Sequence, residues 1–334
     1  MNIGDRVVRK SYNKDIVFKI IDIEIDDEGV KKYLLKGLNI RIEADSIEDD
    51  LEVIDSEGVG EKDKVFNKKV NTALKKVLLS RSYTRGSSAA LRVIDTEINR
   101  KEKKGTSFKN SELFFGRPGK ILHIDGDPQY LDICLKTYKQ LSIEAVGKVI
   151  AEKDQPSQIL DLVKEINPDI VVITGHDGMS KNISDYMDLG NYRNSKYFVE
   201  CVSLLRSYNS NYDDLVIFAG ACQSNYEALL DAGANFASSP SRVLIHCLDP
   251  VLICEKVAYT NIEDIVNIED VIKNTITGIK GVGGLQTRGK YREGYPKSQY
   301  VKWNEKISCD LYNFNYSMYR VKTLKPAWIE QIVN

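Results

Sequence analysis

The chain has 334 residues, 42% of them hydrophobic, which is enough for one large globular domain or two ordinary ones. Its formal net charge of -1 provides no overall field for nucleic acid or a membrane surface, and no apolar run approaches the roughly 18 residues that cross a bilayer. The first residues, MNIGDRVVRK, lack the apolar stretch of a signal peptide, so we expect a cytoplasmic protein.

Cysteine and histidine are sparse and scattered. The six cysteines lie mostly in apolar segments, where cysteine behaves as a small hydrophobe, and no pair has the CxxC spacing of a zinc site. Only three histidines are present. We therefore expect no disulfide framework, no metal site and no cofactor.

Residues 1–56 alternate short apolar runs with turns, as in DRVVRK, IVFKIIDIEI and KKYLLKG. This spacing is typical of a small antiparallel β-barrel, and its size favours an SH3-like one. We interpret the segment as an interaction module without chemistry of its own.

Residues 57–116 are a basic linker in which Lys and Arg far outnumber Asp and Glu. Apolar residues recur there at helical spacing and predict one amphipathic helix: Phe66, Val70, Ala73, Leu74, Val77 and Leu78. Apart from a solvated linker, the composition also suits an arm that binds nucleic acid or an acidic partner.

Residues 117–298 alternate apolar strands with helices, which predicts an α/β domain with a mostly parallel sheet covered on both faces. The Asp249-Pro250 pair predicts a helix N-cap, and a further helix is expected over 263–277. The glycine-rich segment GIKGVGGLQTRGKYREGYP is expected to be a loop or a hairpin rim, and 299–334 a C-terminal extension. The expected strands are ILHIDGD, AVGKVI, DIVVITGHDG and LVIFAGACQS, and the expected helices are 128–141, 156–166, 195–208 and 224–232.

Polar residues follow three of these strands. Asp125 and Asp127 end the first, His176 and Asp177 the third, and Cys222 the fourth. Because parallel strands bring their carboxyl ends to one edge, we expect these side chains to share a crevice.

A thiol needs a base to ionise at neutral pH, so His176 and Cys222 predict a dyad for acyl transfer. The small neighbouring residues leave backbone N–H groups of Asp177, Gly178 and Cys222 available as an oxyanion hole. His123 and His246 lie between apolar residues and are expected in the core.

The order and spacing of His176 and Cys222 resemble the caspase arrangement, in which the histidine lies about fifty residues upstream of the cysteine. Longer motifs, including YRNSKYFVE, LVIFAGACQSNYEALLDAGANFASSPSRV and GVGGLQTRG, resemble the YabG family of sporulation-specific cysteine proteases over about residues 1–296. The resemblance implies a caspase-like fold with catalytic His176 and Cys222. It also implies an endopeptidase of the mother cell that cuts spore coat and cortex-associated proteins after basic residues, chiefly Arg.

A pocket for a basic residue needs a carboxylate, since a desolvated guanidinium without a partner is costly. Gly220 has none to offer, so Asp125 and Asp127 are the candidates, with Asp177 behind them. The alternative for the DGD sequence is a turn that caps the following helix. The basic linker is exposed and arginine-rich, so self-cleavage between Arg81 and Arg100 is expected.

Two other classes of function remain open from the residues alone. A signalling receiver domain would use Asp177 as phosphoacceptor and hold magnesium with Asp125 and Asp127. A nucleic-acid-binding protein would use the basic linker and the N-terminal module.

Overall fold

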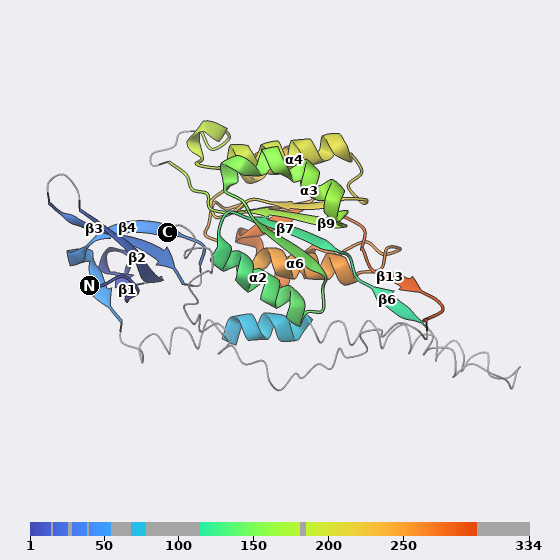
Figure 1. The fold of residues 1–334 in the computed structure, drawn as a ribbon, viewed down its shortest axis with the longest axis horizontal. Helices are drawn as coiled ribbons and strands as arrows, with labels where there is room; N and C mark the ends of the chain where they lie inside the picture. Colours follow the sequence, from blue (N-terminus) through green and yellow to red (C-terminus); the bar gives the residue numbers. More distant parts are fainter. Residues whose placement is uncertain are drawn as a thin grey trace, which may run out of the picture.

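The computed structural model describes residues 1–14, 16–25, 29–38, 40–54, 68–77, 114–180 and 185–298. It contains an N-terminal antiparallel sheet, a larger central sheet with helices on both faces, and a small two-stranded sheet (Figure 1). The C-terminal extension and the expected self-cleavage region lie outside the described residues.

The N-terminal sheet has five antiparallel strands in the order β4-β3-β2-β1-β5. Its strands alternate buried and exposed side chains, as expected for a sheet with one solvated face. The buried face forms a separate small core that includes Val7, Ile20, Tyr33 and Leu35. The strands are β1 (Arg6–Arg9), β2 (Val17–Ile25), β3 (Lys31–Gly37), β4 (Glu43–Ile47) and β5 (Leu51–Val53).

The central sheet has six strands in the order β12-β11-β10-β9-β7-β8. β8, β7, β9, β10 and β11 are parallel, and β12 is antiparallel to β11. Every residue of β7, β9 and β10 is buried, which explains their continuous apolar sequences and confirms the predicted mostly parallel sheet. The strands are β7 (Ile121–Asp125), β8 (Ala145–Val149), β9 (Ile170–Thr174), β10 (Val216–Ala219), β11 (Phe236–Ser238) and β12 (Val282–Gly284).

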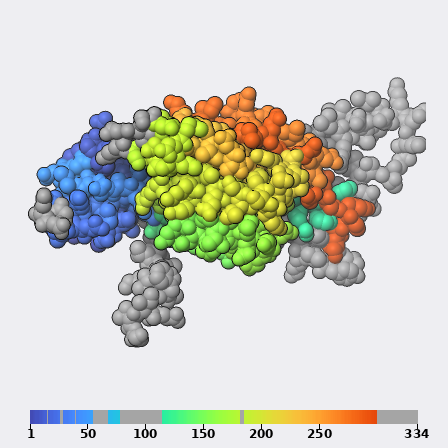
Figure 2. All heavy atoms as spheres, turned by 90° about the horizontal axis from the view of Figure 1, so that it is seen from above, coloured from blue at the N-terminus to red at the C-terminus, as the bar shows by residue number. Residues whose placement is uncertain are grey.

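Helices cover both faces of the central sheet. α3 and α4 lie above it in Figure 1 and α2 and α6 below it, each layer with its own hydrophobic core. Figure 2, viewed from above, shows the N-terminal sheet in blue packed against one end of this α/β body. The helices are α2 (Pro128–Gln140), α3 (Gln155–Ile166), α4 (Ser195–Tyr208), α5 (Tyr226–Asp231), α6 (Asp249–Tyr259) and α7 (Ile268–Lys273).

Short elements complete the described fold. β6 and β13 form the two-stranded sheet, and short 3₁₀ turns connect several of the larger elements. None of the described helices is long and apolar enough to cross a membrane. The bounds are β6 (Phe115–Arg117), β13 (Arg292–Gly294), and 3₁₀ turns Lys10–Tyr12, Glu48–Asp50, Glu152–Asp154, Leu189–Asn191 and Gly278–Lys280.

The predicted linker helix is present over 68–77. Its apolar stripe, Val70, Ala73, Leu74 and Val77, is buried in the same core as α2 and α6. The helix is therefore part of the packed body instead of a solvated linker element, while Phe66 and Leu78 lie outside the described residues.

Three local predictions were wrong. The glycine-rich segment, expected to be a loop or hairpin rim, contributes strand β12, which pairs with β11. Glycine is needed there for close packing, because a Cβ on Gly284 would lie 2.4 Å from the Asn235 carbonyl oxygen. The helix expected over 263–277 is confined to α7. Asp249 does not cap its own helix; its buried carboxylate accepts backbone N–H groups of His246, Ile276 and Thr277.

Candidate active site

The strand order reverses between β7 and β9, because the chain passes from β7 to β8 on one side and then to β9 on the other. In open α/β sheets the ligand-binding crevice lies outside the carboxyl ends of the strands at such a point. Asp125 ends β7, His176 follows β9 and Cys222 follows β10. The structure therefore places these predicted residues at one edge of the sheet.

The turn that carries Cys222 is sharply bent. Gly220 has φ +104°, and a Cβ there would lie 2.5 Å from the Ser238 hydroxyl oxygen, so no residue with a carboxylate fits. Gln223, directly after Cys222, is also left-handed, with φ 58°. Glycine adopts a positive φ freely, whereas the left-handed Gln223 carries backbone strain, which is concentrated at functional sites.

The Cys222 thiol is buried, with 1% of the residue exposed. It lies 2.9 Å from the carbonyl oxygen of Arg41, to which it donates, and it accepts the Ile245 N–H at 3.3 Å. Burial raises the pKa of Cys222 to about 11, although the Ile245 N–H and Arg41 act in the opposite direction. In this arrangement the sulfur is a neutral thiol.

His176 is fixed at its ring and at its backbone. Its Nε2 lies 2.8 Å from Asp127 Oδ2, and its backbone N–H donates to Glu152 Oε1 at 2.6 Å. Within the described residues the other ring nitrogen, Nδ1, has no hydrogen-bond partner, and no hydrogen bond joins the imidazole to Cys222. Hydrogen bonds between catalytic groups are often long before substrate binds.

Asp127 serves both as a helix cap and as a partner of histidine. Its Oδ1 accepts the backbone N–H groups of Gln129 and Tyr130, which confirms the predicted cap of α2. Oδ2 faces His176 and the Lys36 ammonium group, the latter at 2.5 Å. Burial would raise the pKa of Asp127, but these two partners outweigh it and hold the pKa below its usual value. Asp127 is therefore an anion that can orient the imidazole.

Asp125, the last residue of β7, is fully buried. Its Oδ2 lies 2.6 Å from the Arg41 guanidinium and accepts the Thr174 hydroxyl at 2.8 Å, while Oδ1 accepts the Asp127 N–H. Burial acts to raise the pKa of Asp125, but Arg41, His123 and the Asp127 N–H together outweigh it and hold the pKa below its usual value, so the carboxyl is ionised. The structure therefore presents a buried carboxylate paired with an arginine.

Arg41 contacts both the Cys222 thiol and the Asp125 carboxylate. Its carbonyl lies at Cys222, its guanidinium reaches Asp125, and one guanidinium nitrogen donates to the Gly175 carbonyl at 3.1 Å. The guanidinium also lies 5.0 Å from the centroid of the Tyr130 ring, within cation–π range. The distance from Cys222 to Asp125 therefore fits the length of an arginine side chain.

Asp177, next to His176 in the loop after β9, holds this loop in place through hydrogen bonds. Its carboxylate accepts the hydroxyls of Ser195 and Ser224 and the backbone N–H of Asn194. It also accepts the Gly178 N–H at 2.9 Å, one of the groups expected in the oxyanion hole. These bonds join the loop after β9 to the start of α4 and to the turn after Cys222.

This arrangement gives no support to the receiver hypothesis. That hypothesis requires Asp125 and Asp127 to hold one magnesium ion beside the phosphoacceptor Asp177, whereas each of the three carboxylates is bonded to a different set of protein groups. His123 is buried and bonded to Tyr138 and Thr174, which confirms its predicted place in the core.

Glu152 was not predicted to take part in the site. Its carboxylate lies between Gly126 and Gly175, where a Cβ on either glycine would lie within 2.4 Å of Oε1, at 2.2 and 2.3 Å. The two glycines that follow β7 and β9 therefore admit the carboxylate that holds the His176 backbone. Their matching positions were the only sequence signal, and they did not identify the partner.

Three possible metal ligands lie together at the edge of the site. Among the described residues, one group of three possible ligands comes together, namely Glu43, Asp127 and His176, with ligand atoms within 4.8 Å of one another. The Lys36 ammonium group already neutralises Asp127 there. These side chains therefore form an ion-pair network with Lys36.

Comparisons with known proteins identify the family of this chain. A family model described as YabG peptidase U57 matches residues 2–296. The sporulation-specific protease YabG of Bacillus subtilis (strain 168) is 43% identical over 297 residues, covering 88% of this chain and 97% of that protein. Among solved structures, none gives a significant match. The chain belongs to the YabG family of peptidases.

Proposed function

We propose that the protein is a cysteine endopeptidase in which His176 and Cys222 form the catalytic dyad. His176 Nδ1 takes the thiol proton, and the thiolate attacks the carbonyl carbon of the scissile bond to form an acyl-enzyme. The imidazolium then protonates the leaving amine, and water hydrolyses the thioester with His176 again acting as base. Asp127, on Nε2, stabilises the imidazolium and keeps the ring oriented.

The oxyanion of the tetrahedral intermediate is assigned to backbone N–H groups of Asp177, Gly178 and Cys222. The Gly178 N–H, now bonded to Asp177, has to be released or shared when substrate binds.

The preference for arginine is assigned to Asp125. The single observation that carries the proposal is Arg41, whose carbonyl lies at the thiol while its guanidinium pairs with the buried Asp125. A substrate arginine before the scissile bond would place the same two groups at the same two partners. Asp127 and Asp177, the other candidates for this pocket, have the different roles described above.

The fold supports the same proposal. A mostly parallel sheet with His176 and Cys222 after neighbouring strands suits a caspase-like domain over 117–298. The five antiparallel strands within 1–56 suit an SH3-like barrel, followed by the linker 57–116 and the extension 299–334.

The relative named as a sporulation-specific protease supports a role in sporulation. We assign as substrates spore coat and cortex-associated proteins in the mother cell, at the developing coat. Self-cleavage in the basic linker between Arg81 and Arg100 belongs to the same proposal.

The proposal is tested with matched peptides that differ only at the residue before the expected cut. Arginine, citrulline and leucine peptides are incubated with the purified protein, and the products are mapped by mass spectrometry. We expect cleavage after arginine and at least about 100-fold less after citrulline, which has the same shape without the charge. Equal cleavage of the arginine and citrulline peptides would refute the assigned specificity.

Glu152 is expected to act through the position of His176. Because Glu152→Ala removes the acceptor of the His176 N–H, we expect kcat to fall about 10- to 100-fold with little change in KM. Glu152→Gln keeps an acceptor oxygen and should recover most of the activity. Steady-state kinetics measure kcat and KM separately. A Glu152→Gln variant as impaired as Glu152→Ala would show that the charge of Glu152 matters instead of its hydrogen bond.

A further inference from the structure

The chain's own N-terminal sheet covers the candidate active site, through contacts of Arg41 with Cys222 and Asp125. Arg41 lies in the connection between β3 and β4, and it is 2% exposed. Its carbonyl and guanidinium hold the thiol and Asp125, two groups that lie far from it in the sequence, the thiol 181 positions away. A peptide substrate cannot enter while this residue is in place.

Further contacts hold the connection in the crevice. The Tyr130 hydroxyl lies 2.8 Å from the Gly37 carbonyl and 3.0 Å from the Ile40 carbonyl, and Ile40 forms an antiparallel bridge with His246. The contacts come from two separate parts of the central domain, α2 and the segment before α6. The connection is therefore bound as a peptide would be, before and at the arginine.

Charged residues beside the connection engage the catalytic base. Lys36 of β3 pairs with Asp127, and Glu43 of β4 lies 3.8 Å from His176 Nε2. The N-terminal sheet thus contacts the proposed nucleophile, the specificity carboxylate and the partner of the base.

After Arg41 the chain turns back toward β3 and forms hydrogen bonds within the N-terminal sheet. The Ile42 N–H donates to the Ile40 carbonyl at 2.9 Å, and the Ile42 carbonyl accepts the Gly37 N–H at 2.8 Å. If the bond after Arg41 were attacked, the new amine of Ile42 would stay held by the sheet beside the acyl group. A tethered leaving group favours resealing of the bond over hydrolysis.

We propose that the β3–β4 connection is a built-in inhibitor: Arg41 occupies the arginine pocket and keeps the enzyme latent until the N-terminal sheet is displaced. This inference rests on the proposed function for its account of regulation, but the occlusion of Cys222 can be measured without it. The interaction module predicted from sequence would then control access to the active site.

The test compares Arg41→Ala with wild type and with Arg9→Ala. Arg9 is a matched control, because it lies on the same sheet and pairs with Asp50. Two rates are measured on the full chain: alkylation of Cys222 by iodoacetamide, followed on its peptide by mass spectrometry, and cleavage of an arginine peptide. Tyr130→Phe is a second variant that loosens the connection without removing the buried ion pair.

We expect Arg41→Ala to raise both rates at least about tenfold. This factor follows if fewer than about one wild-type molecule in ten has the connection displaced from Cys222, because only those molecules react. Tyr130→Phe should raise them by a smaller factor, and Arg9→Ala should match wild type. Faster alkylation without cleavage by any form supports the occlusion and refutes the proposed function instead.

Two outcomes would overturn the inference. One is unchanged alkylation in both Arg41→Ala and Tyr130→Phe. The other is wild-type protein that cuts its own Arg41–Ile42 bond as fast as it cuts the peptide, because the connection would then be a substrate.

Discussion

Asp125→Asn is expected to abolish the preference for arginine while leaving the weak cleavage after neutral residues intact. In this variant the guanidinium of a bound substrate would be buried without a counter-charge. Breaking one partner of a buried charge pair costs about 3–5 kcal/mol, so the arginine to citrulline ratio of kcat/KM should fall by roughly 10²–10⁴.

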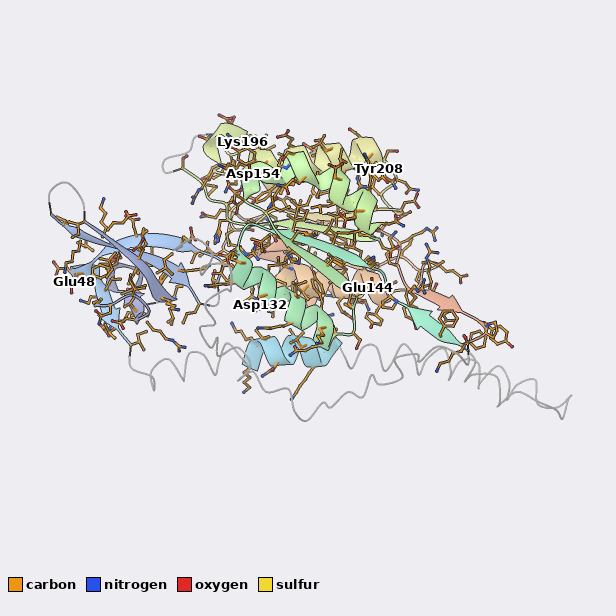
Figure 3. All side chains as sticks on the ribbon, viewed as in Figure 1. Glu48, Asp132, Glu144, Asp154, Lys196 and Tyr208 are labelled. Carbon is orange, nitrogen blue, oxygen red and sulfur yellow. The ribbon has the colours of Figure 1, made fainter. Side chains whose placement is uncertain are left out.

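The ratio of the two substrates is the appropriate measurement here. Asp125→Asn also removes the partner of Arg41, and both a change in latency and a loss of folded protein alter the two rates equally. The control is Asp132→Asn, whose carboxylate is exposed on α2 and paired with Lys136 (Figure 3). A ratio that stays at the wild-type value would place the specificity carboxylate elsewhere.

Much of the α/β fold was predictable, because buried parallel strands have continuous apolar sequences. β7, β9 and β10 are of this kind, and their predicted positions were confirmed. β12 was missed because two of its three residues are glycines. Glycine is required at these positions because neighbouring backbone and side chains pack too closely to admit a Cβ. A local pattern does not reveal such a requirement.

The sequence predicted where the candidate site residues lie, because they follow or end buried strands, but it did not predict their contacts. Cys222, His176, Asp125 and Asp127 could be placed on one edge, because all follow or end buried parallel strands. Their separate roles could not be assigned, since both aspartates belong to the same DGD sequence. The structure separates them: Asp125 faces a guanidinium, and Asp127 faces the imidazole.

The part played by the N-terminal sheet had no signal in the sequence. Arg41 is one of many basic residues, and its contacts with Asp125, Gly175 and Cys222 are all distant along the chain. Such contacts depend on how the sheet packs against the end of the α/β body. In Figure 3, Lys196 marks the start of α4 near this packed end, and Tyr208 marks the opposite end of the helix.

Loss of either member of the dyad is the second large effect expected. In the proposed mechanism, Cys222→Ala removes the atom that forms the acyl-enzyme, and His176→Ala leaves a thiol whose pKa, about 11 in this buried state, keeps it protonated at neutral pH. Each substitution should lower kcat by at least about 10³, and the double variant should be no worse than the singles, because the two residues act as a unit.

The most direct measurement of the central claim is the initial rate of cleavage of the arginine peptide by wild type, Cys222→Ala and His176→Ala. Cys201→Ala is the matched control, since Cys201 is also buried but lies in α4, within the hydrophobic core of the α3 and α4 layer. We predict cleavage by wild type and Cys201→Ala and none above background by the other two. Cleavage that persists in a folded Cys222→Ala protein would contradict the cysteine mechanism.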